Sequence, residues 1–422
     1  MLRHSCCVLG PVVAMLAAAC VGGRAGEVQS TIRDSAGVEI VEIRATDADL
    51  PRWRLSAAPR LTIGTIEGEA AYQFAGIRGA MMHRERLLVI DGGSRELRFF
   101  DRSGKHLRSV GRRGGGPGEF EQPNWIGLHA GDSIAVYDGR LRRFTILDAA
   151  GTLRRVFTPG FRATGIVGRL ADGSYIVNPI AVTVPRPDQR DGVRRDTIGI
   201  ARMSADGERM DTLAIYPGLE TVIADISVGD LAMIRESIRV FGLSTQVAAG
   251  DSSIYVGTTD SWAIDVLDAD GRTRRSIRRA VERRPVTPGI IERYRAAELA
   301  ATRTEAMRQR AENRFAELAY PEQLPAHGRL LVDADGFLWV QDYVVARDEP
   351  TEWTVFDLEG RMTGRVSMPP RFTAHQIGPD FVLGRGQDDL DVEYIVVYGL
   401  DRSGPGDIAA APRPAPTGGG RQ

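Results

Sequence analysis

Short apolar runs alternate with polar turns along most of the chain, and within many runs apolar and polar residues alternate singly. This period of two is typical of β-strands. The clearest recurring signal is an apolar strand followed by Asp-x-x-Gly. The aspartate accepts hydrogen bonds from backbone amides, and the glycine takes the positive φ that closes a hairpin. Copies begin at Asp101, Asp148, Asp268, Asp357 and Asp401, with a degenerate copy at Ser204.

A second signal lies upstream of each of these turns. A polar turn leads into a short β-rich run, which occupies residues 86–91, 132–138, 172–177, 251–256, 335–342 and 380–383. An apolar segment precedes each run, and a further strand follows five of the six turns. Each unit therefore predicts four antiparallel strands.

Six such units predict an all-β fold, a six-bladed β-propeller over residues 34–402. The last unit lacks an outer strand, because the residues that follow Gly404 are rich in proline. The strand-like N-terminal segments 38–44 and 53–63 are expected to fill this place and close the last blade, which removes an exposed sheet edge. A sandwich array and a seven-bladed ring are the alternatives. We expect residues 403–422 to form a disordered tail.

Residues 287–318 interrupt the β pattern. Thr287 and Pro288 have the residue types of a helix cap and a first helical position, and apolar residues then recur at steps of three or four. The segment predicts one long helix or a helical hairpin between the fourth and fifth blades. It is either a lid or partner-binding helix, or a decoration packed on the propeller.

The N-terminus predicts export. Residues 1–19 combine Arg3 with an apolar run too short to span a bilayer, as in a signal peptide. Small residues before Cys20 resemble a bacterial lipobox, which implies lipidation of Cys20; a plain secretory signal is the alternative. Residues 20–33 then form a lipidated tether, and the resemblance implies the outer membrane, facing the periplasm or the surface. No cysteine follows Cys20, so the body has no disulfide or thiolate site.

Composition narrows the range of partners. Apolar residues make up 43 % of the 422 residues and charged residues 26 %, as in an ordinary globular protein. The net charge of −1 provides no overall field toward nucleic acid or an anionic membrane. We therefore expect no nucleic-acid partner, membrane contact only through the lipid anchor, and a monomer.

Three acidic residues are candidates for a metal site. Asp389, Asp391 and Glu393 are expected to share one strand face, and carboxylates in a row can hold Ca²⁺. The alternative is a solvated hairpin. No other cofactor is predicted.

Two further groups are candidates for a ligand face. Arg112 and Arg113 precede a glycine-rich loop, which forms either an anion-binding nest or a turn between blades. Asp91, Asp138 and Asp342 end equivalent strands. They either bind a cation in the channel or accept hydrogen bonds from turn backbone.

The chain carries no catalytic motif. Its histidines are scattered, and it has neither a Gly-x-Ser-x-Gly elbow nor a dinucleotide fingerprint. We assign no catalytic and no cofactor-binding residue, and the sequence favours a non-enzymatic role.

The segment from Val110 to Phe120, with Gln122-Pro123 and the strand ending at Asp138, resembles an NHL repeat. Over about residues 31–402 the chain is similar to bacterial exported six-bladed propeller proteins of the NHL-like group. The resemblance implies the fold and export more than an activity.

Two functions follow as expectations. The first is a cell-envelope lipoprotein whose propeller binds or scaffolds a protein, peptide or glycan of the envelope. The second is a divalent-metal-dependent hydrolase or lyase of the lactonase-like type, which holds its ion with Glu, Asn and Asp. The chain has only Asn124, Asn178 and Asn313, which disfavours the second function.

Overall fold

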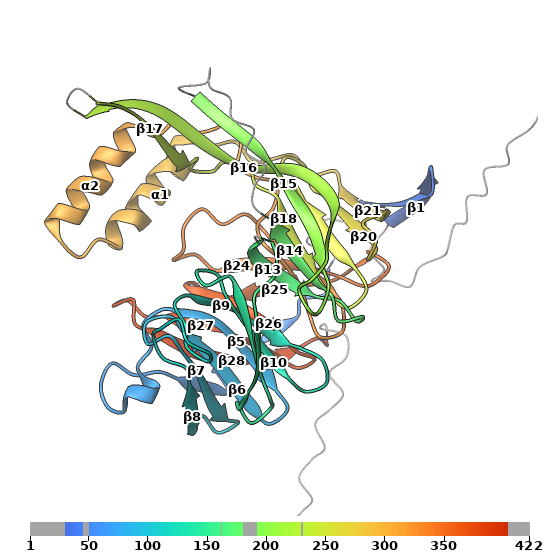
Figure 1. The fold of residues 1–422 in the computed structure, drawn as a ribbon. Coiled ribbons are helices and arrows are strands. Elements are labelled where there is room, and N and C mark those ends of the chain that lie inside the picture. The colour runs from blue at the N-terminus through green and yellow to red at the C-terminus, as the bar shows by residue number, and fades with distance from the viewer. Residues whose placement is uncertain (1–29, 45–49, 162, 180–191, 229–230, 404–422) are drawn as a thin grey trace, which may run out of the picture.

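The computed structural model describes residues 30–44, 50–161, 163–179, 192–228 and 231–403 (Figure 1). The predicted signal peptide, Cys20, most of the tether and nearly all of the C-terminal tail lie outside these residues. Within the described residues, no helix has the length and apolar character needed to cross a bilayer.

The first two blades are regular four-stranded meanders, in which each strand pairs with the next. The first blade consists of β5 (Ile77–His83), β6 (Arg86–Asp91), β7 (Glu96–Asp101) and β8 (His106–Val110). The second consists of β9 (Pro123–Leu128), β10 (Ile134–Asp138), β11 (Arg143–Leu147) and β12 (Leu153–Phe157). A short 3-10 turn, η2 (Ala70–Tyr72), precedes them.

The third blade has five strands, and two of them extend beyond the blade. It consists of β13 (Ala163–Arg169), β14 (Tyr175–Pro179), β15 (Gly192–Met203), β16 (Met210–Val228) and β17 (Leu231–Ile238). The last part of β16 pairs with β17 and projects as a hairpin arm (Figure 1). In the sequence, the third unit has Ser204 in place of the repeated aspartate. The structure adds the hairpin arm to the same unit.

The last three blades complete the ring. The fourth consists of β18 (Gln246–Ala249), β19 (Ile254–Gly257), β20 (Ala263–Leu267) and β21 (Thr273–Arg279). The fifth consists of β22 (Leu330–Val332), β23 (Leu338–Gln341), β24 (Thr351–Phe356) and β25 (Met362–Met368). The sixth consists of β26 (Phe372–Ile377), β27 (Phe381–Gln387) and β28 (Glu393–Asp401).

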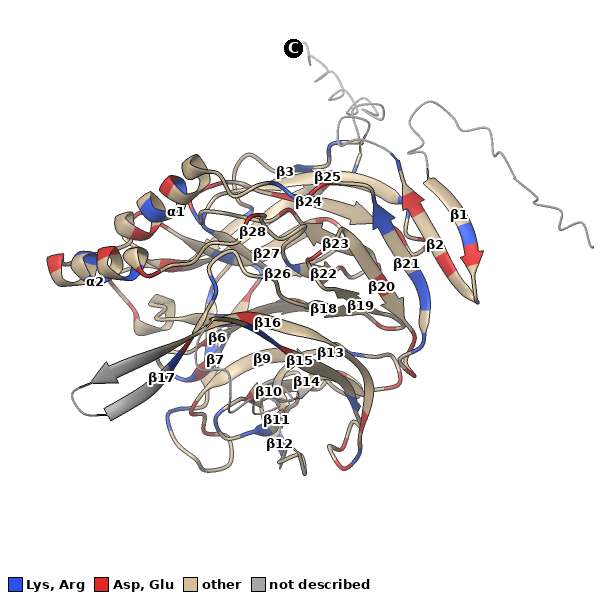
Figure 2. Ribbon diagram, turned by 90° about the horizontal axis from the view of Figure 1, so that it is seen from above, with Lys and Arg blue, Asp and Glu red and all other residues tan. Residues whose placement is uncertain are grey.

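N-terminal strands join two blades, not one. β3 (Arg54–Leu55) and β4 (Leu61–Ile63) pair with β28, so segment 53–63 closes the last blade as predicted. β2 (Val38–Ile43) instead pairs in parallel with β21 of the fourth blade, and β1 (Ser30–Ser35) pairs with β2 at the rim (Figure 2). Val41 and Ile43 of β2 are buried in the core between the fourth and fifth blades, which explains this placement.

Six hydrophobic clusters lie between consecutive blades and close the ring. Each cluster combines buried side chains of two neighbouring blades, including the cluster between the sixth blade and the first. A sandwich array would not join its last sheet to its first in this way. The arrangement confirms the six-bladed propeller.

The repeated turn has the predicted chemistry. Asp101 accepts hydrogen bonds from the amides of Ser103 and Lys105 at 2.9 Å each, and Gly104 has φ +85°. Asp148, Asp268 and Asp357 make the same pair of bonds. The side chain thus fixes the turn that joins the third strand to the fourth.

The insertion is a helical hairpin, made of α1 (Pro288–Ala300) and α2 (Glu305–Ala316). The Thr287 side chain accepts from the Ile290 amide, as predicted for a cap. Ile290 packs with Phe241 in a small cluster outside the blades, and the Tyr294 ring contacts the rings of both Phe241 and Phe315. The helices therefore share a small core with the segment that follows β17.

Candidate functional site

The predicted ligand-face residues lie on one face of the disc. In each blade the chain enters the innermost strand from the preceding blade, and the turn between the second and third strands returns to the same side. We call this side the upper face. The helical hairpin leads into β22 and therefore also emerges here.

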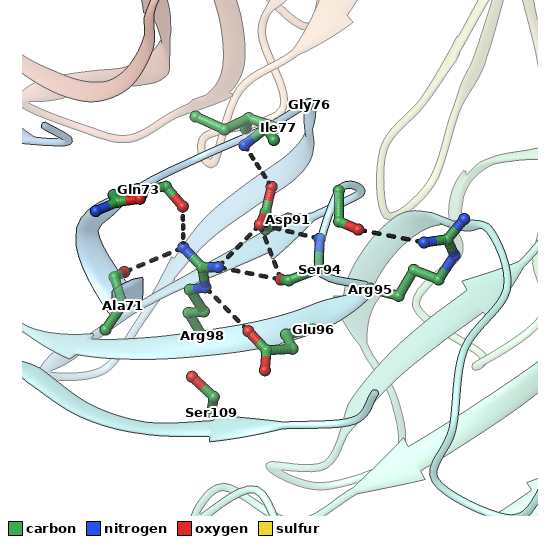
Figure 3. A network of polar contacts seen from close by, with 12 residues as sticks. Ala71, Gln73, Gly76, Ile77, Asp91, Ser94, Arg95, Glu96, Arg98 and Ser109 are labelled. Carbon is green, nitrogen blue, oxygen red and sulfur yellow. Dashed lines mark hydrogen bonds and ion pairs between the residues drawn. The ribbon is translucent and has the colours of Figure 1, made fainter. Parts of the chain in front are cut away.

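Asp91 is part of a buried ion pair on the upper face (Figure 3). Only 1 % of Asp91 and 4 % of Arg98 is exposed, and Arg98 Nη2 lies 2.9 Å from Asp91 Oδ2. Asp91 also accepts from the amide of Ala75 and the hydroxyl of Ser94. Arg98 donates to the carbonyl of Gln73 at 2.6 Å. The carboxylate is therefore used to hold the turn and the incoming chain together.

Asp138 has the equivalent role in the second blade. Its Oδ2 accepts from the amides of Glu121 and Gln122 at 2.7 and 2.9 Å, and its Oδ1 accepts from the amides of Arg140 and Leu141. All of these donors are backbone groups of the surrounding turns. Of the two predicted roles, Asp91 and Asp138 therefore have the second, in which the carboxylate accepts hydrogen bonds from turn backbone.

Asp342 differs from the other two aspartates. It is partly exposed and forms an ion pair with Arg365 Nη2. Its carboxylate is therefore already engaged in the fifth blade.

The glycine-rich loop folds around a different arginine from the two predicted. Arg143 donates to the carbonyls of Gly115, Gly116 and Glu119. The Gly116 amide donates to the Glu119 carboxylate at 2.8 Å, and Arg112 pairs with the same carboxylate at 2.7 Å. These bonds lower the pKa of Glu119. The loop is therefore a turn between blades whose polar groups largely satisfy one another.

Arg113 of the same loop lines a pocket. The pocket has a volume of about 440 Å³ and lies between the first and second blades. Its charged lining residues are Arg78, Arg95, Arg113, Arg140 and Glu121. These residues come from the first residues of β5, from the two turns that the aspartates anchor, and from the loop that leads into β9.

Positive charge dominates this pocket. Arg113 Nε lies 4.0 Å from Glu121 Oε2, and Arg95 donates to the carbonyls of Glu121 and Gly93. Among the described residues, the guanidinium groups of Arg78 and Arg140 have no carboxylate within ion-pair distance. Four guanidinium groups therefore face one carboxylate, which leaves a net of three positive charges.

Sequence reasoning identified Arg113 and missed the other three arginines. Arg95 follows Asp91 by four residues and Arg140 follows Asp138 by two, so both belong to turns whose anchors had been recognised. An arginine shortly after the aspartate in each of these two turns was the sequence feature that could have indicated the pocket. Arg78 had no such marker.

The candidate metal residues do not form the expected strand face. Asp389 and Asp391 lie in the turn between β27 and β28, and only Glu393 belongs to a strand. Asp389 is fully exposed near Arg371, whereas Asp391 pairs with Arg303. Glu393 accepts from the amides of Gly76 and Ile77 and pairs with Arg385. Across the described part of the chain, no three His, Cys, Asp or Glu side chains are placed to hold a metal ion.

Comparison with protein families gives one match. A family described as a 6-bladed beta-propeller (DUF5128) matches residues 68–152, which cover the first blade and most of the second. No curated protein matches the sequence.

Solved structures with a similar course of the chain share little sequence. One from Bacteroides vulgatus, a member of the DUF4221 family, is 9 % identical with a TM-score of 0.46, covering 90 % of this chain and 100 % of its own. A Bacteroides fragilis protein whose export is inferred is 9 % identical with a TM-score of 0.45, covering 83 % and 99 %. A gluconolactonase from Xanthomonas campestris is 13 % identical with a TM-score of 0.41, covering 82 % and 99 %. None of them assigns a ligand to this chain.

Proposed function

We propose that the chain is an exported, lipid-anchored propeller that acts as a binding module, and that its ligand is a small polyanion or the polyanionic end of a larger molecule. The observation that carries this proposal is the arginine pocket between the first and second blades. Its four guanidinium groups face a single carboxylate. Exposed arginines that are not paired within the protein are available to a ligand.

The chemistry of the pocket favours carboxylate or phosphate groups. A guanidinium group presents a planar fork of donors that matches both groups, and such charge-assisted bonds are strong. None of the described residues that line the pocket is aromatic, so they offer a neutral sugar no stacking platform. Arginines on different loops suit a ligand with more than one anionic group.

The predicted anchor is compatible with this role. If Cys20 carries lipid, nine residues separate it from β1, which begins at Ser30. The ten residue steps from Cys20 to Ser30, fully extended, reach at most about 35 Å. The anchor would therefore hold the rim of the fourth blade close to the membrane and leave the first and second blades on the far part of the ring. No observation on the described residues favours the metal-dependent hydrolase.

Calorimetric titration with citrate, inorganic phosphate and acetate tests the proposal. The protein used begins at residue 21 and keeps every described strand. We expect citrate to bind more tightly than acetate, and binding to weaken as salt is added. Substitutions R78Q and R140Q each remove an unpaired cation, and each is expected to weaken citrate binding about tenfold or more, since a hydrogen bond to a charged group contributes about 1.5–3 kcal/mol.

The matched control is R209Q, which removes the same charge from an exposed turn on the opposite face. If R209Q weakens citrate binding as much as R78Q does, the net charge of the protein, not the pocket, governs binding. Absence of binding by all three anions to the unsubstituted protein would overturn the proposal.

A further inference from the structure

One carboxylate lies among the four guanidinium groups of the arginine pocket, and it belongs to Glu121. The backbone that carries it is held by both neighbouring blades. The amides of Glu121 and Gln122 donate to Asp138 Oδ2 of the second blade. The Glu121 carbonyl accepts from Arg95 Nε of the first blade at 3.0 Å. The Glu121 side chain therefore starts from a fixed point between the two blades.

The Glu121 carboxylate itself can accept hydrogen bonds from a ligand. Its ion-pair partner is Arg113, whose Nε lies 4.0 Å from Glu121 Oε2, which is too far for a hydrogen bond. Among the described residues, no donor is hydrogen-bonded to either carboxylate oxygen. The side chain is 26 % exposed, so a ligand in the pocket can reach it. An ionised carboxylate accepts hydrogen bonds and donates none.

The other cations of the pocket are directed elsewhere. Arg95 donates to backbone carbonyls. Arg78 lies against Gly92, where an added Cβ would be 3.0 Å from Arg78 Nε, so the glycine leaves room for this side chain. In the part of the chain that the structure describes, neither Arg78 nor Arg140 lies within ion-pair distance of Glu121. The pocket thus keeps cationic donors and an anionic acceptor apart from one another.

A ligand that satisfies both kinds of group must carry two kinds of group itself. Its acid groups would pair with the guanidinium groups of Arg78 and Arg140. An acid group placed beside Glu121 would be repelled, and a ligand without a donor would remove water from this carboxylate without replacing its hydrogen bonds. Such an unpaired polar group lowers affinity. A hydroxyl or ammonium group beside Glu121 avoids both penalties.

We propose that Glu121 is a specificity-determining residue of the arginine pocket, and that the ligand is an anion with a hydrogen-bond donor beside its acid groups. The inference rests on the proposed function, since it names the class of anion that the same pocket binds. Hydroxy acids, sugar acids and amino acids with more than one acid group share this chemistry.

Calorimetric titration with citrate and tricarballylate tests the inference, because the two tricarboxylates differ only by the hydroxyl group of citrate. The protein begins at residue 21, and the buffer is at pH 8 without divalent cations. We expect citrate to bind about tenfold more tightly than tricarballylate, since hydrogen bonds to charged groups are strong. Succinate, malate and aspartate differ only by hydrogen, hydroxyl or ammonium at one carbon, and they separate the two kinds of donor.

The variant E121M removes the acceptor and keeps a similar side-chain length. We expect both tricarboxylates to bind more tightly to E121M, because one negative charge is lost, and the preference for citrate to disappear. The matched control is E85M, which removes the same charge from a 76 % exposed side chain between β5 and β6, on the opposite face. E85M should keep the preference. The comparison of the two ligands on the unsubstituted protein needs no variant.

Equal binding of citrate and tricarballylate to the unsubstituted protein would overturn the inference and leave the proposed function standing. A preference for citrate that persists in E121M would also overturn it, since the hydroxyl group would then be bound by another residue. If neither tricarboxylate binds, the proposed function fails and this inference fails with it.

Discussion

The buried pair of Asp91 and Arg98 supports one prediction in detail. Substitution of Arg98 by Met removes the cation and keeps a similar side-chain length. The Asp91 carboxylate would remain almost fully buried, and the carbonyls of Ala71 and Gln73 would lose their donor. Breaking a buried pair from one side costs about 3–5 kcal/mol, since it leaves an uncompensated charge. We expect a loss of that order in the free energy of unfolding.

The assay is equilibrium unfolding in urea at pH 7, followed by the fluorescence of the buried tryptophans. The matched control is R102M, which breaks the pair of Arg102 and Glu85, whose side chains are 61 % and 76 % exposed. An exposed pair contributes about 0–1 kcal/mol, so the control should change little. The double variant D91N/R98M should cost less than the sum of the two single variants, because both remove the same interaction.

A functional readout accompanies the stability measurement. Asp91 anchors the turn that carries Arg95 into the arginine pocket, so R98M should also weaken citrate binding. Equal and small losses of stability for R98M and R102M would refute the reasoning, since the buried pair would then contribute no more than an exposed one.

Three further predictions concern other parts of the ring. Gly151 has φ +83°, and an added Cβ would lie 2.8 Å from the Phe99 ring of the first blade, so G151A should destabilise the protein by about 1–3 kcal/mol, measured by urea unfolding; an unchanged midpoint would contradict this. Burial raises the pKa of Tyr175 to about 12, so the stability that it contributes is present below its unfolded pKa of about 10 and is lost as the pH rises toward 12. The Tm of Y175F should therefore fall less than that of the unsubstituted protein between pH 10 and 12, and parallel curves would show that Tyr175 has no part in the loss. Replacement of residues 287–318 by a short Gly-Ser linker should leave a folded propeller, because Val286 and Glu322 are already hydrogen-bonded at 2.8 Å; loss of the β signal in circular dichroism would show that the helices are required for folding.

The strands and their turns were predictable because their causes are local. An aspartate that binds the amides two and four residues ahead, followed by a glycine of positive φ, specifies a hairpin wherever it occurs. The structure places the turns at Asp101, Asp148, Ser204, Asp268 and Asp357 as predicted. For the last copy, Ser403 donates to Asp401, and Gly404 lies outside the described residues. Repetition of the unit then led to the number of blades, since each unit needs neighbours to bury its two faces.

The placement of the N-terminal strands was not local in this sense. The sequence pattern predicts strands in segments 38–44 and 53–63, but it does not indicate which other strands they pair with. β2 joins β21 because Val41 and Ile43 complete the core between the fourth and fifth blades. Such complementarity exists only when the ring has formed.

The candidate sites likewise depend partly on local sequence and partly on tertiary packing. The sequence alone determined the all-β architecture, the six blades and the helical insertion, because turn chemistry, strand period and helix caps act over a few residues. Only the tertiary structure decided that Asp91 and Asp138 hold backbone, that Asp389 and Glu393 lie apart, and that arginines separated by up to 62 positions, from Arg78 to Arg140, line one pocket. A ring brings the same position of every blade to one face, so chemistry that is scattered along the chain becomes a site only in three dimensions.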